Sequence, residues 1–141
     1  THKIIGILVL SLIFSVGHAQ KRGKIRQAAK EYDNFAYLKT SEILLEVAEG
    51  GFTSVDLLQK LANSFYFNND MENAAKWYGE LVTLNEPLDA EYYFRYAQAL
   101  KYGENYEESD KWMKKFNELK PSDLRGKAFL SKVDDKASID R

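Results

Sequence analysis

The stretch NDMENAAKWYGELVTLNE, residues 69–86, decides the fold of this chain because its packing pattern occurs a second time. The second copy is ENYEESDKWMKKFNELKP, residues 104–121, at an offset of 35. Small residues align with small residues and large with large: Ala74 with Ser109, Trp77 with Trp112, Leu81 with Phe116. A chain that repeats a packing pattern builds a stack of similar units, so the repetition indicates architecture and not one special site.

Each copy has a matching segment upstream at the same offset. In every segment the apolar residues recur at intervals of three and four, which is one stripe of an α-helix, so the repeating unit is predicted to be a helix pair. A weaker copy precedes the first, as expected for a terminal repeat whose outer face meets water. The matched upstream residues are Leu58, Leu61, Ala62 and Phe65 with Tyr93, Tyr96, Ala97 and Leu100, and the weaker copy carries Ala28 at the alanine position.

Helix boundaries are predicted from the polar and glycine residues between the apolar stripes. Asp70 and Asn105 are expected to cap the second helix of their pairs. Gly50 or Gly51 is expected to adopt the left-handed conformation after the first pair. After Pro121, Ser122 or Asp123 is expected to cap one further helix that covers the end of the stack with Leu124, Ala128 and Phe129.

A period of 34 to 35, a small residue in each helix and a closing proline make residues 24–121 resemble the tetratricopeptide repeat (TPR) family. The resemblance implies an all-α solenoid of about three helix pairs with a C-terminal capping helix. The expected divisions are a signal peptide at 1–19, TPR-like repeats within 20–121 at about 24–52, 55–87 and 90–121, and a capping helix with the start of a linker or tail at 122–141.

The N-terminus has the layout of a secretory signal peptide. An apolar run at residues 4–16 follows Lys3 and precedes the small-residue stretch at 17–19. The run is shorter than the ~20 residues that a membrane-spanning helix needs, which favours cleavage after Ala19 over a permanent anchor. We therefore expect an exported protein with no stable membrane span after cleavage.

Composition narrows the function classes. With 141 residues and 45% apolar content, the chain suits one domain, and 20 basic against 21 acidic residues give no overall attraction to nucleic acid. There is no cysteine, and both histidines, His2 and His18, fall in the predicted signal peptide. Catalysis or metal binding through imidazole or thiolate is thus excluded for the cleaved chain, and we expect no enzyme, no cofactor and no metal.

Nearly the whole chain is also similar to the N-terminal TPR region of exported OmpA-family envelope proteins of Bacteroidota. The segments that carry this resemblance include KRGKIR, FAYLKTSEILLEVAEGGF, KWYGELVTLNE, AEYYFRYAQALK and SDLRGKAFL. It implies a periplasmic scaffold in outer-membrane organisation or type IX secretion, with an envelope protein or peptide segment as partner, outer-membrane proteins among them. Because the sequence lacks an initiating Met and stops near KASIDR, the alternative is the N-terminal fragment of a longer structural protein that links outer membrane and peptidoglycan.

The first helices of TPR stacks line a concave face that holds peptides in family members, so the resemblance places the candidate binding residues there. Amides can bond a peptide backbone, cations can meet a carboxylate, and aromatic rings supply contact area. The alternative is a solvated groove without a partner. The candidates are Arg26 and Tyr32 in the first repeat, Gln59, Asn63, Tyr66 and Phe67 in the second, and Phe94, Arg95, Gln98, Lys101 and Tyr102 in the third.

Three other patterns have competing interpretations. A clamp for a C-terminal carboxylate is disfavoured because Ile25 stands where a cation is expected. The run KRGKIR, residues 21–26, suits anionic lipid headgroups or an acidic partner, or is simply a solvated helix start. The run NNDMEN, residues 68–73, resembles a calcium loop only loosely and is better explained as a capped helix turn.

Overall fold

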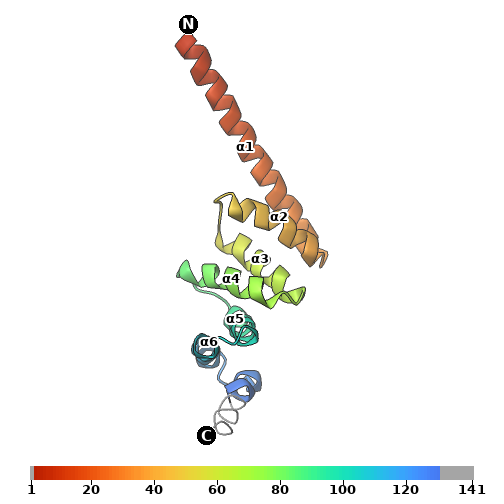
Figure 1. Cartoon of the computed structure of the whole chain (residues 1–141), viewed down its shortest axis with the longest axis vertical. Helices are drawn as coiled ribbons and strands as arrows, with labels where there is room; N and C mark the ends of the chain where they lie inside the picture. The colour runs from red at the N-terminus through yellow and green to blue at the C-terminus, as the bar shows by residue number, and fades with distance from the viewer. Residues whose placement is uncertain (1, 131–141) are drawn as a thin grey trace.

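The computed structural model describes the backbone of residues 2–130 and the side chains of residues 17–130. All regular structure within these residues is helical (Figure 1). The predicted tail at 131–141 lies outside the described residues. The helices are α1 (His2–Asp33), α2 (Tyr37–Glu49), α3 (Val55–Phe67), α4 (Met71–Thr83), α5 (Ala90–Tyr102) and α6 (Tyr106–Leu119), followed by a helical segment at 124–130.

The helices stack in chain order from α2 to the segment at 124–130, and the N-terminal part of α1 projects away from the stack (Figure 1). Each helix from α1 to α6 packs against the next along the chain, and the first helices also meet across the stack, α1 with α3 and α3 with α5. The predicted all-α, TPR-like solenoid of helix pairs is therefore confirmed.

The repeated small residues lie where helices pack most closely. Ala28, Ala62, Ala74 and Ala97 are completely buried. At the fifth small position, the buried Ser109 hydroxyl donates a hydrogen bond of 2.7 Å to the carbonyl of Ala97, which fastens α6 to α5. A larger residue at such a position would overpack the contact, so the repetition of small residues follows directly from the helix pairing.

The turn inside each helix pair has the same backbone conformation. Phe35, Asn69 and Glu104 occupy the left-handed region, with φ angles of 60°, 61° and 62°. The predicted left-handed glycine after the first pair is Gly51, with φ of 89°, and not Gly50.

The two predicted caps of the second helices behave differently. The Asp70 side chain accepts a hydrogen bond of 3.2 Å from the backbone N–H of Asn73, as predicted. Asn105 makes no side-chain capping bond, so that prediction is wrong. Glu107 and Glu108 lie in the first turn of α6. Their negative charges interact favourably with the positive end of the helix dipole and so stabilise this helix end without a side-chain cap.

The helix at 124–130 is capped as predicted, but only one of its three predicted covering residues packs on the stack. Asp123 accepts a hydrogen bond of 3.0 Å from the backbone N–H of Arg125. Leu124 is 72% exposed and Ala128 is also exposed, so their predicted role as cover is wrong. Phe129 is half-buried against the stack, as predicted. Gly126 lies on the same packed face, and an added Cβ there would stand 2.9 Å from the ring of buried Phe116.

At the N-terminus, α1 runs without a break through Ala19 and Gln20, where cleavage is predicted. The cleavage itself stays a prediction. Across the described residues, no helix combines the length and the apolar character that crossing a membrane requires.

Candidate partner-binding surface

Asn63 is the most connected of the predicted binding residues. Its side-chain Nδ2 donates to the Tyr32 hydroxyl at 2.9 Å, and its Oδ1 accepts from the Tyr78 hydroxyl at 2.7 Å and from Arg95 at 3.1 Å. We call these four residues the Asn63 junction. It joins α1, α3, α4 and α5 through one amide group.

Asn63 was expected to face outward, and that expectation is wrong because the residue is only 3% exposed. Buried polar atoms need hydrogen-bond partners, and the junction supplies them from within the chain. Burial also raises the pKa of Tyr78 above its usual 10.0, which keeps its hydroxyl protonated as a donor to Asn63. The amide of Asn63 therefore shapes the surface from below, and its role in partner binding stays a prediction.

Arg95 is half-buried against the rings of Tyr66 and Phe67. Its guanidinium carbon lies 5.0 Å from the ring centre of Phe67 and 5.9 Å from that of Tyr66. Attraction between a cation and aromatic faces holds such a side chain in place. These two rings of α3 therefore hold the positive charge of Arg95, from α5, next to the exposed Phe67.

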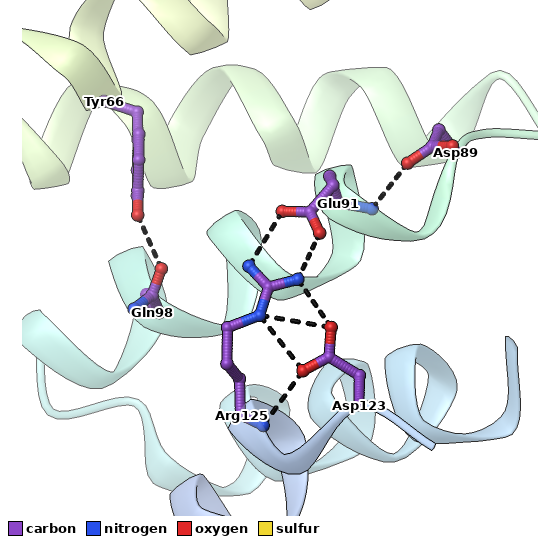
Figure 2. Close-up of polar contacts among 6 residues, drawn as sticks. All are labelled: Tyr66, Asp89, Glu91, Gln98, Asp123 and Arg125. Carbon is purple, nitrogen blue, oxygen red and sulfur yellow. Dashed lines mark hydrogen bonds and ion pairs between the residues drawn. The ribbon is translucent and has the colours of Figure 1, made fainter. Parts of the chain in front are cut away.

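A second link between the same two helices lies nearby. The Tyr66 hydroxyl donates a hydrogen bond of 2.6 Å to Oε1 of Gln98 (Figure 2). Burial is the main cause that raises the pKa of Tyr66 above its usual 10.0. The structure thus brings together six of the predicted residues, namely Tyr32, Asn63, Tyr66, Phe67, Arg95 and Gln98.

An exposed aromatic row continues from this set toward the turn between α1 and α2. The ring of Phe67, 43% exposed, lies 4.8 Å from that of Tyr37. The Tyr37 ring in turn lies 6.2 Å from Phe35, which is 76% exposed. The candidate residues predicted from the sequence include neither the exposed Phe35 nor the half-buried Tyr37, because they were drawn from the first helices alone and these two residues lie at the turn into α2.

Two predicted residues of α5 lie under the helix at 124–130. Phe94 is only 9% exposed and its ring packs 5.0 Å from that of Phe116, so the expectation that it faces outward is wrong. Lys101 places its Nζ 4.1 Å from the ring centre of Phe129. The C-terminal helix therefore occupies this end of the predicted groove.

Arg125 holds that helix in place, and sequence reasoning missed it. Its guanidinium carbon lies 4.6 Å from the ring centre of Phe94. The guanidinium also pairs with Glu91 of α5 and with Asp123 (Figure 2). Hydrogen bonds from Arg125 lower the pKa of the Asp123 carboxyl. One pattern in the sequence could have placed Arg125 near the start of a further repeat helix. Pro121 and Asp123 repeat the spacing of Pro87 and Asp89 at an offset of 34.

The remaining predicted residues lie apart from this set. Arg26 is exposed on α1, and Gln59 is half-buried on α3. Tyr102 is 70% exposed and lines a hollow of about 370 Å³ between α4 and the turn from α5 to α6. Among the side chains of residues 17–130, no three His, Cys, Asp or Glu gather where a metal ion would bind.

Comparison with known proteins agrees with the geometry of the third helix pair. Residues 90–123 match the family model of the tetratricopeptide repeat. This segment contains all of α5 and α6 and ends at Asp123, the cap of the next helix. No protein with a curated description matches the chain. A TPR segment in a stack of helix pairs is typical of modules that bind other proteins and that lack catalytic activity.

Proposed function

We propose that this protein is a non-enzymatic scaffold that binds a protein or peptide segment along its first helices, α1, α3 and α5. The observation that carries the proposal is the match of residues 90–123 to the tetratricopeptide repeat. The first helix of this segment, α5, lies in one row with α1 and α3, since α1 contacts α3 and α3 contacts α5. The Asn63 junction and the bond from Tyr66 to Gln98 hold these helices in fixed relation. A preorganised surface loses less conformational freedom on binding than a mobile one.

The proposed contact surface centres on the C-terminal half of α3. Phe67 offers an exposed ring, and Arg95 offers a cation held against that ring. Gln98 offers the nitrogen of its amide, whose oxygen already accepts from Tyr66. This combination suits an extended segment that places an apolar side chain on Phe67 and an acidic or carbonyl oxygen near Arg95. Asn63 supports this surface from below through its bond to Arg95.

The cellular setting is proposed as the periplasm, in outer-membrane organisation or type IX secretion. Support comes from the signal-peptide layout of residues 1–19 and from the resemblance to OmpA-family envelope proteins. An outer-membrane protein would then be among the partners. The same resemblance supports the alternative of a TPR region within a longer OmpA-family structural protein that links outer membrane and peptidoglycan.

Affinity capture from solubilised envelope, with quantitative mass spectrometry, tests the proposal. The bait is the chain itself, beside a surface variant, Phe67→Ala with Gln98→Ala, and a matched control on α4, Lys76→Ala with Glu80→Ala. We expect at least one protein that the wild type and the control enrich and that the surface variant recovers at least tenfold less.

Circular dichroism of the three baits establishes that each is folded. Equal recovery by the surface variant and the control would place the interface on another face, contrary to the proposal. Enrichment of nothing over a resin blank by any bait would contradict the scaffold function itself.

A further inference from the structure

Charge is distributed unevenly along the chain. Residues 1–30 contain six of the 20 basic residues and none of the 21 acidic ones. Residues 31–141 therefore hold 14 basic against 21 acidic residues, a net charge of −7. The near-neutral net charge of the chain is thus the sum of a basic N-terminal segment and an acidic helical stack. Such charge asymmetry points to an anionic partner for the N-terminal segment.

Three of these cations form a stripe on α1. Arg22, Arg26 and Lys30 are all exposed and follow one another at intervals of four, which places them on one side of the helix. We call them the basic stripe. Ala28, which is completely buried, lies on the opposite side, where α1 packs on the stack. The stripe therefore faces away from the rest of the protein.

Two other cations of residues 1–30, Lys21 and Lys24, have partners within the protein. Lys24 pairs with Glu46 of α2, and the adjacent Glu31 pairs with Lys39 at 2.9 Å. Lys21 lies 5.0 Å above the ring of Phe52. In the part of the chain that the structure describes, no ion pair involves a cation of the basic stripe.

The surroundings of the stripe favour a lipid surface over other polyanions. The stripe continues, in the same unbroken helix, from the apolar run at residues 4–16. A bilayer offers acyl chains and anionic headgroups side by side, which suits an apolar stretch followed directly by cations. An acidic protein or a nucleic acid offers no counterpart to the apolar run. The part of α1 that carries this sequence projects from the stack, where a flat surface can reach it (Figure 1).

We propose that the basic stripe of α1 binds the anionic headgroups of a lipid bilayer and so holds the helical stack at a membrane surface. This interaction is separate from partner binding on α3 and α5. If the chain is cleaved after Ala19, the apolar run is removed and the stripe remains in the mature protein, within about three turns of its new end, so that binding to headgroups then depends on the stripe alone.

Sedimentation with lipid vesicles tests the proposal on the full chain. The vesicles are phosphatidylcholine with and without phosphatidylglycerol, and the readout is the ratio of the two partition coefficients. The stripe variant carries Arg22→Gln, Arg26→Gln and Lys30→Gln. The control removes three exposed cations at the other end of the molecule, Lys114→Gln, Lys120→Gln and Lys127→Gln, and so changes net charge equally.

We expect the wild type and the control to prefer vesicles with phosphatidylglycerol, and added salt to weaken this preference. Each cation near an anionic surface contributes about a fivefold gain, so the stripe variant loses on the order of a hundredfold. Equal binding of the wild type to both kinds of vesicle would overturn the proposal and assign binding to the apolar run. An equal loss in the control would also overturn it, because net charge alone would then explain the binding.

Discussion

At the scale of single residues, one amide group links four helices. Asn63 uses both polar atoms of its side chain for hydrogen bonds with Tyr32, Tyr78 and Arg95. The sequence predicts the buried stripe of α3 correctly at Leu58, Leu61 and Ala62, since these positions follow helical periodicity. Asn63 lies beside that stripe, and its burial depends on covering side chains from α1 and α5, which the periodicity of one helix cannot reveal.

The first prediction concerns this residue. Asn63→Ala leaves the Tyr78 hydroxyl and the Arg95 guanidinium without their acceptor, and an unpartnered buried polar group costs about 1–3 kcal/mol. We expect the free energy of unfolding, measured with urea, to fall by about 2–3 kcal/mol. Gln27→Ala, which removes an exposed amide from α1, serves as control and should stay within about 0.5 kcal/mol of the wild type. A similarly small change for Asn63→Ala would show that the junction contributes no stability.

At the scale of elements, helical periodicity predicts the pairing well and the ends of helices less well. Existence and order of the helices follow from apolar residues at intervals of three and four. The cap at Asp70 and the left-handed Gly51 were predictable from local turn chemistry. The role of Arg125 was not, because its partners Glu91 and Phe94 lie more than 30 residues earlier in the chain.

A comparison of two caps tests the account at this scale. Asp70→Ala removes the side-chain bond to the N–H of Asn73, and loss of such a cap typically costs about 1 kcal/mol. Asn105→Ala removes a side chain that makes no capping bond at the equivalent place in the next pair, so we expect a change of only a few tenths of a kcal/mol. Urea unfolding of both variants gives the comparison. Equal losses, or a larger loss for Asn105→Ala, would contradict the assigned capping.

At the scale of the whole molecule, the stack presents its first helices side by side as a continuous surface. The repeat period alone predicts the solenoid, because each unit needs neighbours to bury its apolar face. The sequence also indicates which helices line the surface. It also predicts a C-terminal helix over the end of the stack with Phe129 among its packed residues, but it does not indicate the contacts of Arg125 with α5 and α6.

Site-directed photo-crosslinking in intact cells tests the central claim, partner binding along the first helices, most directly. Benzoylphenylalanine is placed at the exposed Phe67 or the half-buried Gln59 or Gln98 on the first helices, and at the exposed control positions Lys76, Glu107 or Lys114 on α4 and α6. We predict a discrete protein adduct from the first-helix positions and none from the control positions. An adduct that forms from α4 and α6 while the first helices give none would contradict the account.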